Sequence, residues 1–298
     1  MNLIKRMSQM PYLLLIFPPL FWAGNAVLAR GVVGVVPPIS LAYFRWVFAF
    51  LVVLPFGLSY AQQDWPKVRE KWPIVIALGF LGITCFNSLL YASAQTTTSI
   101  NIAVLQTFMP AVVILFSLAL FRESATAVQW LGVLLSTAGA IVIVSAGNPL
   151  SLLSNGLVIG DGIMLTGVVL YALYSVILRF RPEIHALSLL VYTFAAGIIM
   201  LTPFYLWELT TVGGFTVTAG VATSFVYLAI CPSVLAYLCW NQGVKLAGPN
   251  RAGLFINLLP VFAAVLAVIF LNESVQWFHL VGMGLVFGGM MLFNRKSG

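Results

Sequence analysis

Charged residues are what this sequence has least of. Only 7% of its 298 residues are charged, and only seven are acidic. Soluble domains carry about 25% charged residues, so a water-exposed fold of this size is excluded. An enzyme in a membrane would still need a convergent set of acids, bases or nucleophiles. We find no such set, and we therefore predict no catalytic residues and no enzymatic activity.

Cysteine and histidine are also scarce. The three cysteines, Cys85, Cys231 and Cys239, lie in apolar runs without CxxC spacing, which argues against disulfides and against a metal site. His185 and His279 have no neighbours in the sequence that suggest metal binding or catalysis. The sequence therefore predicts no metal and no cofactor.

Apolar residues dominate instead, at 61% of the chain. A helix of about 20 apolar residues spans the hydrocarbon core of a bilayer. Charges, Pro/Gly clusters and polar runs divide the chain into ten such segments, at approximately 10–30, 39–59, 72–94, 99–121, 126–146, 157–179, 186–207, 216–240, 250–271 and 275–294. The first resembles a signal peptide but continues without a small-residue cleavage site, so we interpret it as a membrane helix. The prediction is an all-α polytopic membrane protein with ten transmembrane helices in a lipid bilayer.

The basic residues orient these helices. Twelve of the fourteen fall in alternate connections or at the termini, namely Lys5, Arg6, Lys67, Arg69, Lys71, Arg122, Arg179, Arg181, Lys245, Arg251, Arg295 and Lys296. This bias is what the positive-inside rule predicts for cytoplasmic loops, with both termini cytoplasmic. It also explains the net charge of +7, so no nucleic-acid partner is expected.

Two arginines do not follow this pattern. Arg30 lies at the outer end of the first helix, and Arg45 lies about two turns into the second. Two turns place Arg45 roughly 9 Å from the outer end of its helix. We expect its side chain to snorkel outward, with a role in substrate binding as the alternative.

The chain repeats itself after 150 residues. "TFMPAVVILFSLALFRES" (107–124) aligns without a gap to "NLLPVFAAVLAVIFLNES" (257–274). The matching residues are prolines, glycines and glutamates, which affect the backbone or the charge and would not match merely because both segments are apolar. They are Pro110 with Pro260, Glu123 with Glu273, Gly132 with Gly282 and Gly139 with Gly289. Each half, 1–148 and 149–298, therefore holds five helices, and because five is odd the halves are inverted relative to each other. Inverted repeats of this kind are typical of transporters, with substrate bound near the midplane between them.

The prolines of this repeat lie inside apolar helices. Proline removes a helical hydrogen bond and bends the helix, so Pro110 and Pro260 are either hinges of a transport movement or fixed kinks required by packing. Glu123 and Glu273 are expected to cap or brace loop ends.

These residues, together with "FWAGNAVLAR" in the first helix, resemble the drug/metabolite transporter superfamily. The resemblance is to the EamA-type exporters with two five-helix repeats, and most of all to their aromatic amino acid exporter branch. It implies a bacterial inner-membrane protein that exports amino acids or similar metabolites. It also implies a central cavity among helices one, three, four, six, eight and nine.

Polar groups at helix depth are candidates for lining that cavity, because intramembrane polar groups usually face the bundle interior. The predicted substrate-binding residues are amides and amphipathic aromatics: Trp22, Asn25, Asn87, Tyr91, Asn101, Gln106, Tyr171, Tyr174, Tyr237, Trp240, Asn241 and Asn257. Asn87 and Tyr91 share a helix face, and Tyr237 and Asn241 repeat the pair at the 150-residue shift with the residue types exchanged. Such groups suit a zwitterion with a flat apolar side chain. The alternatives are interfacial anchors for the aromatics and interhelical hydrogen bonds for the amides.

The sequence also bears on proton coupling, on self-association and on the rival functions. No carboxylate falls in the middle third of a predicted helix, and Asp161, near an outer helix end, is the best candidate for proton coupling. Gly284 and Gly288 have GxxxG spacing, which serves internal packing or a dimer, so the chain is expected to be a monomer or a weak homodimer. The closest rival function is efflux of drugs or aromatic cations, because aromatic faces also bind cations. A channel or a membrane enzyme fits inverted repeats with kinked helices less well.

Overall fold

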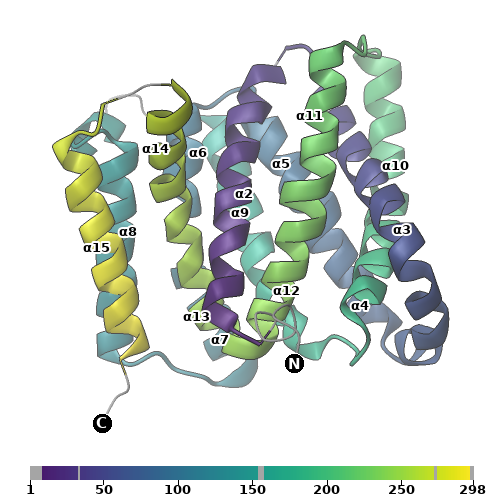
Figure 1. The fold of residues 1–298 in the computed structure, drawn as a ribbon, viewed down its shortest axis with the longest axis horizontal. Helices are drawn as coiled ribbons and strands as arrows, with labels where there is room; N and C mark the ends of the chain where they lie inside the picture. The colour runs from purple at the N-terminus through teal and green to yellow at the C-terminus, as the bar shows by residue number, and fades with distance from the viewer. Residues whose placement is uncertain (1–8, 33, 154–157, 272–273, 296–298) are drawn as a thin grey trace.

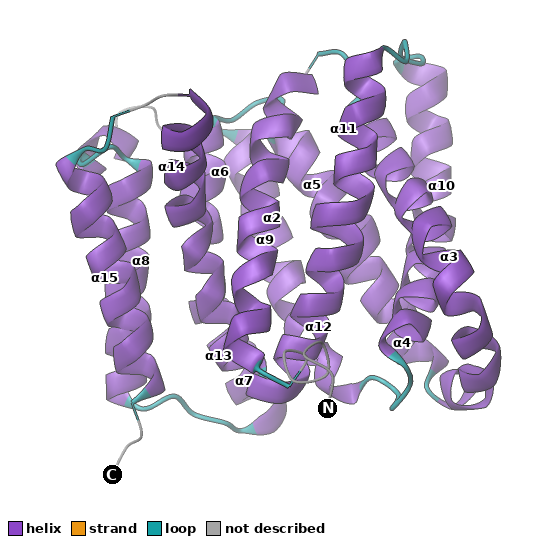
Figure 2. Cartoon of the chain, viewed as in Figure 1, coloured by secondary structure: helices purple, strands orange, loops and turns teal. Residues whose placement is uncertain are grey.

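The structure of the protein is a computed structural model that describes residues 9–32, 34–153, 158–271 and 274–295. This part of the chain consists of helices and loops without a strand (Figure 2). Nine helical segments in it are long and apolar enough to cross a membrane, and α2 is a further helix of 22 residues that runs among them (Figure 1). The prediction of ten membrane helices is confirmed.

The first half contains five helices, three of them unbroken. The unbroken ones are α2 (Pro11–Val32), α3 (Pro38–Glu70) and α8 (Ala127–Val144). The third helix of the chain consists of α4 (Trp72–Leu78), the π-helical η1 (Gly79–Cys85) and α5 (Phe86–Ser93). The fourth consists of α6 (Ser99–Gln106) and α7 (Met109–Phe121).

The second half follows a short 3₁₀ segment, η2 (Pro149–Leu153), and repeats this pattern. Its sixth and seventh helices are α9 (Ile159–Ile177), continued by η3 (Leu178–Phe180), and α10 (Ala186–Thr211). The eighth consists of α11 (Ala219–Ala229), the π-helical η4 (Ile230–Leu235) and α12 (Ala236–Ala247). The ninth consists of α13 (Pro249–Leu254), η5 (Phe255–Asn257) and α14 (Leu258–Leu271), and the tenth is α15 (Trp277–Asn294).

Two helices extend beyond their predicted ends. The second was expected to stop at residue 59 and the eighth at residue 240, but α3 continues to Glu70 and α12 to Ala247. In both cases the apolar run ends first, and exposed polar residues such as Gln62, Gln63 and Lys245 continue the helix. The apolar run therefore predicted only part of the length of each helix.

Helix contacts show the inverted repeat directly. The first helix, α2, packs against α12 and α14 of the second half, and its counterpart α9 packs against α5 and α7 of the first half. The second helix pairs with the seventh (α3 with α10), and the fifth pairs with the tenth (α8 with α15). When the two halves are exchanged, the contacts of α2 map onto those of α9, and the α3–α10 and α8–α15 contacts map onto themselves. The molecule is therefore built around a pseudo-two-fold axis, with the α8–α15 pair at one end of the bundle and the α3–α10 pair at the other (Figure 1).

The repeated glycines explain the contact between α8 and α15. A Cβ added to Gly132 would lie 2.7 Å from the Gly289 carbonyl oxygen, and one added to Gly139 would lie 2.6 Å from that of Gly282. Each glycine thus meets the repeat equivalent of the other, as two-fold symmetry requires, and the backbones approach closely because no side chain separates them. The GxxxG pair is not part of this close contact: an added Cβ on Gly284 has no heavy atom within 4 Å, and one on Gly288 lies at an ordinary 3.8 Å from Leu135.

Helix irregularities also come in symmetric pairs. The π-helical segments η1 and η4 occupy equivalent positions in the third and eighth helices. The fourth and ninth helices are interrupted just before their prolines, with Pro110 at the second position of α7 and Pro260 at the third position of α14. Proline is tolerated in a first turn, where its missing N–H has no intrahelical partner. The fourth and ninth helices are therefore interrupted next to their prolines. The π segments of the third and eighth helices are a second pair of symmetric irregularities, which the sequence did not predict.

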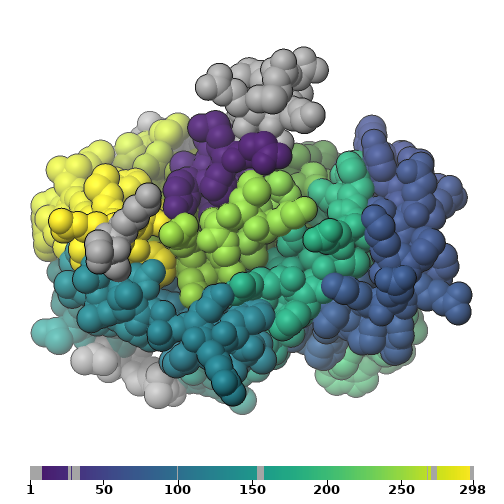
Figure 3. Space-filling model, turned by 90° about the horizontal axis from the view of Figure 1, so that it is seen from below, coloured from purple at the N-terminus to yellow at the C-terminus, as the bar shows by residue number. Residues whose placement is uncertain are grey.

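One end of the bundle carries the basic residues of the connections, and we call it the basic face. In the described part it is defined by Lys67, Arg69, Lys71, Arg122, Arg179, Arg181, Lys245, Arg251 and Arg295. It is the lower end in Figure 1, where α2 begins and α15 ends, and Figure 3 views the molecule from this side. Glu123, expected to brace a loop end, lies here and pairs with Arg179 at 2.7 Å. Its repeat partner Glu273 lies outside the described residues.

The α8–α15 contact gives a testable prediction. Gly139→Leu should destabilise the protein by about 1–3 kcal/mol, the usual cost of overpacking, because its side chain has no room against Gly282. For a chain of this size such a loss lowers the melting temperature by roughly 2–5 °C. The matched control is Gly284→Leu, which places the same side chain in open space on α15. Thermal unfolding in detergent measures both, and equal melting temperatures would contradict the packing described here.

Candidate functional site

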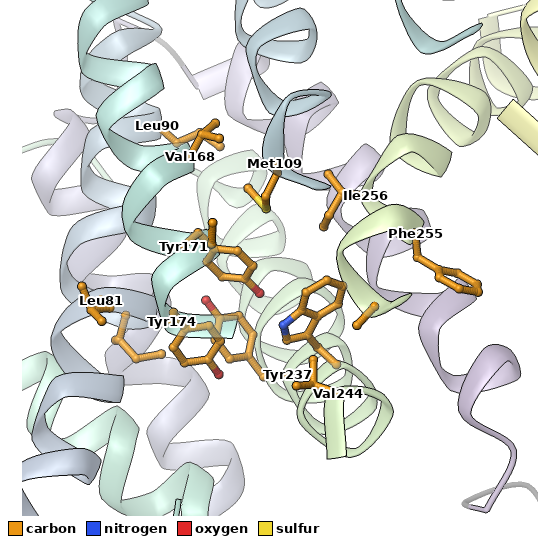
Figure 4. Close-up of a cluster of buried hydrophobic side chains, with 14 of the residues drawn as sticks. Leu81, Leu90, Met109, Val168, Tyr171, Tyr174, Tyr237, Val244, Phe255 and Ile256 are labelled. Atoms are coloured by element: carbon orange, nitrogen blue, oxygen red, sulfur yellow. The ribbon is translucent and has the colours of Figure 1, made fainter. Parts of the chain in front are cut away.

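A group of five aromatic residues lies at the centre of the molecule, where α2, α9 and α12 meet. We call Trp22, Tyr171, Tyr174, Tyr237 and Trp240 the aromatic cluster. The Trp22 ring meets Tyr171 edge-on at 5.7 Å between centroids and meets Trp240 at 5.5 Å. Tyr174 lies 5.1 Å from Tyr171 and 5.9 Å from Tyr237. All but Trp22 are almost completely buried, and Figure 4 shows the three tyrosine rings turned toward one another.

The polar tips of this cluster bond to the π-helical segments. The Tyr237 hydroxyl donates to the Gly82 carbonyl in η1 at 2.5 Å, and Trp22 Nε1 donates to the Pro232 carbonyl in η4 at 3.1 Å. Gly82 and Pro232 are equivalent positions of the two repeats. Gly82 also has to be glycine, because an added Cβ would lie 2.6 Å from the Tyr174 ring. Each half of the fold thus contributes one π segment that accepts a hydrogen bond from the aromatic cluster. Such π-helical segments frequently occur at functional sites.

The amides of the predicted site form a symmetric pair of hydrogen bonds. The Tyr91 hydroxyl of α5 donates to Asn25 Oδ1 of α2 at 3.0 Å. The Tyr174 hydroxyl of α9 donates to Asn241 Oδ1 of α12 at 2.7 Å. Asn25 and Tyr174 are equivalent at a shift of 149, and Tyr91 and Asn241 at a shift of 150. The same bond therefore occurs twice, with donor and acceptor exchanged between the repeats.

Arg45 joins this network, contrary to the expectation that it would snorkel outward. Its side chain is 1% exposed and turns into the bundle. Nε donates to Ser233 Oγ at 2.7 Å, Nη1 to Asn87 Oδ1 at 2.7 Å and to the Tyr91 hydroxyl at 2.9 Å, and Nη2 to the Pro232 carbonyl at 3.0 Å. Amide, hydroxyl and π-segment oxygens inside the fold thus provide the acceptors that the outward conformation was expected to seek in water. The sequence did contain an indication of this role, because an ionisable residue within a membrane helix is by default a candidate for function.

Nine of the twelve predicted residues are thus connected, either in the aromatic cluster or through Asn25, Asn87, Tyr91 and Asn241. The other three lie elsewhere. Asn101 is half-buried and donates to Thr97 and to Asp161, and Gln106 donates to the Ile102 carbonyl of its own helix.

Asn257, the third of these, lies at the interruption of the ninth helix. Its Nδ2 contacts Ser136 Oγ at 3.1 Å and Thr137 Oγ1 at 3.4 Å on α8. The Thr137 hydroxyl in turn donates to the Thr107 carbonyl at the interruption of the fourth helix, at 3.0 Å. One threonine therefore links the two helix breaks that precede Pro110 and Pro260.

Asp161 lies in the first turn of α9, away from the aromatic cluster. Its carboxylate accepts from the Thr97 hydroxyl at 2.5 Å, from Asn101 Nδ2 at 3.1 Å and from the Val158 backbone N–H at 3.0 Å. Negative charge is favourable at a helix N-terminus. These contacts are those of a helix cap that also ties α9 to the loop before α6.

Two cavities open at the basic face beneath the aromatic cluster. One, of about 540 Å³, is lined by Lys71, Glu123, Arg179, Arg181, Pro182, Glu183, Val244, Lys245, Leu246, Ala247 and Gly248. The other, of about 450 Å³, shares Arg181 and Lys245 with it and extends to Asn241. Burial lowers the pKa of the Arg181 guanidinium. Asn241, which lines the second cavity, accepts the hydrogen bond of the Tyr174 hydroxyl and so connects the wall of this cavity to the aromatic cluster.

No group of three or more His, Cys, Asp or Glu side chains within the described ranges is arranged to hold a metal ion. The side chains gathered at this site are aromatic rings, amides and a buried guanidinium.

Comparison with known proteins places the chain among transporters. Residues 9–145 and 158–295 each match the EamA-like transporter family. The uncharacterized transporter YyaM of Bacillus subtilis is 28% identical over 94% of this chain and 92% of its own length. A probable terminal-alkyne amino-acid exporter of Streptantibioticus cattleyicolor is 26% identical over 78% of this chain and 76% of its own. A solved crystal structure shares the fold, with a TM-score of 0.77 over 96% of this chain and 98% of that chain at 19% identity.

The two matched ranges follow the two halves that the contacts reveal, and the relatives that bear functional names are transporters and not enzymes. The chain is a multi-pass membrane protein, and it belongs to the EamA-like transporter family of the drug/metabolite transporter superfamily.

Proposed function

We propose that this protein exports amino acids, aromatic and other neutral ones, across the bacterial inner membrane. The observation that carries the proposal is the aromatic cluster with its amides, buried at the interface between the two repeats. Transporters of inverted-repeat architecture hold their substrate at this place. The relative named as a probable amino-acid exporter supports this substrate class.

The chemistry of the cluster suits a zwitterion with a flat side chain. Aromatic pairs gain about 0.5–1.5 kcal/mol beyond area burial, preferably edge-to-face or offset. Amides both donate and accept, so they can satisfy an ammonium and a carboxylate together. The cluster and its neighbours offer these groups from both halves of the fold.

The paired Tyr–Asn bonds suggest how access alternates. The basic face is the cytoplasmic side under the positive-inside rule, so the Tyr174–Asn241 bond closes the path from the cytoplasm. The equivalent Tyr91–Asn25 bond lies toward the opposite face. Opening one while keeping the other exposes the cluster to one side at a time, with the interruptions before Pro110 and Pro260 as hinges.

The decisive measurement is transport in proteoliposomes. Labelled phenylalanine, tryptophan, threonine and methyl viologen are offered, each with and without a pH gradient. We expect transport of the amino acids, with the aromatic ones fastest. Transport of methyl viologen alone would favour efflux of aromatic cations, and no transport of any amino acid would overturn the proposal.

Removal of single side chains from the predicted substrate site should reduce transport without preventing folding. Trp22→Ala and Tyr91→Ala should each reduce amino acid transport about tenfold, since a 1.4 kcal/mol loss of binding is a factor of ten. Expression should stay normal. Trp207→Ala is the matched control, because that tryptophan is 62% exposed on the outer surface of α10. Unchanged rates in both test variants would remove Trp22 and Tyr91 from the site.

Proton coupling through Asp161 can be tested separately. Because its carboxylate caps α9 and is held by three donors, Asp161→Asn should lower the melting temperature. The amide should leave the ratio of transport with and without a pH gradient as it is in the natural protein. A variant that still transports but no longer responds to the gradient would instead assign the coupling to Asp161.

A further inference from the structure

The positive charge of Arg45 is not paired with any acidic side chain that the structure describes. All four of its partner residues are neutral: Ser233, Asn87, Tyr91 and Pro232. Within the described residues the one ion pair is Arg179–Glu123, at the basic face. A buried ion without a partner of opposite charge is strongly unfavourable, and the cost is greater where lipid replaces water. Neutral hydrogen bonds alone would not require a residue that carries this cost.

The donors around Arg45 also exceed the acceptors. A guanidinium has five N–H groups, and the four bonds of Arg45 leave one N–H on Nη2 unused. Asn87 accepts from Arg45 through Oδ1, while its buried Nδ2 makes no hydrogen bond. In the adjoining aromatic cluster the buried Trp240 Nε1 makes none either. Positive charge together with unused donors is the complement of an anionic acceptor.

The position of Arg45 connects this anion-binding chemistry to the aromatic cluster. The Pro232 carbonyl accepts from both Arg45 and Trp22, so the two residues meet at one atom of η4. Trp22 in turn contacts Tyr171 and Trp240. A molecule with its ring among these aromatics and a carboxylate a few bonds away could reach the guanidinium.

We propose that Arg45 selects the charge of the substrate by binding its carboxylate. This rests on the proposed function and narrows it: the transported molecules are aromatic or apolar carboxylates, and the amino group is secondary. The carboxylate accepts from the unused Nη2 N–H of Arg45 and from Asn87 Nδ2. Aromatic cations that lack a carboxylate are rejected, because the same charge repels them.

The test measures binding of four matched aromatic molecules to the purified protein in detergent by isothermal titration calorimetry. 3-Phenylpropionate carries only the carboxylate, phenylalanine carries both groups, phenylethylamine carries only the ammonium, and methyl viologen is a dication. We expect the two carboxylates to bind at least tenfold more tightly than either cation. Preference for phenylethylamine or methyl viologen would overturn both this inference and the proposed function, and so would the absence of binding by all four.

Variants then assign the preference to the residue. In Arg45→Gln the two carboxylates should lose at least tenfold in affinity, and phenylethylamine should bind no more weakly than before. Arg45→Lys keeps the charge and should keep the order. Arg69→Gln removes an exposed arginine from the same helix and is the control.

The outcomes distinguish the two proposals. If the natural protein transports phenylalanine and Arg45→Gln still prefers carboxylates, charge selection by Arg45 is wrong and the proposed function stands. If Arg45→Gln does not fold, the ligand series on the natural protein and on Arg45→Lys still decides whether the site selects negative charge.

Discussion

The structure depends on one constraint: inside a bilayer, a polar group must find its partner within the protein. Helices satisfy the backbone, but the π-helical segments and the interruptions before Pro110 and Pro260 leave irregular positions that side chains have to serve. The structure meets this need across the repeat interface. Gly82 and Pro232 receive donors from the opposite half, and Thr137 receives Asn257 while donating to Thr107. The irregular positions are therefore also the points at which the halves are joined.

Pseudo-symmetry gives these junctions a functional meaning. Because each half has an odd number of helices, a contact near one face of the membrane has its counterpart near the other. The Tyr91–Asn25 and Tyr174–Asn241 bonds are such counterparts, and they are chemically the same bond. Two packings that exchange their roles should thus differ little in free energy. Two conformations are both populated only when their free energies are close.

Much of the fold followed from the sequence, because hydrophobic length and charge placement are local properties. The ten helices, their inversion and the glycines of α8 and α15 could be predicted from the 20-residue runs and the 150-residue repeat. Nine of the proposed site residues are connected, because periodicity fixes which residues share a helix face. The sequence could not show that Asn101 and Asn257 lie apart from these nine. An amide that bonds to Asp161 or to α8 occupies the same kind of position in an apolar helix as an amide that lines a cavity. The inward turn of Arg45 involves partners more than 180 residues away, Ser233 and Pro232, which no local pattern records. The π segments likewise contact residues of the other half, as the bond from Tyr237 to Gly82 shows.

The charges along the molecule bear on the charge of the substrate. Lys71, Arg179, Arg181 and Lys245 line the cavity at the basic face, against Glu123 and Glu183. Glu123 is already paired with Arg179, so the net field of that cavity is positive. Arg45 is a further positive charge inside the bundle, and no described acidic side chain pairs with it. Under the proposed function, a molecule that carries a carboxylate meets favourable potential at both places. Aromatic rings alone would bind anions and cations alike, so in this proposal the guanidinium discriminates between the two classes.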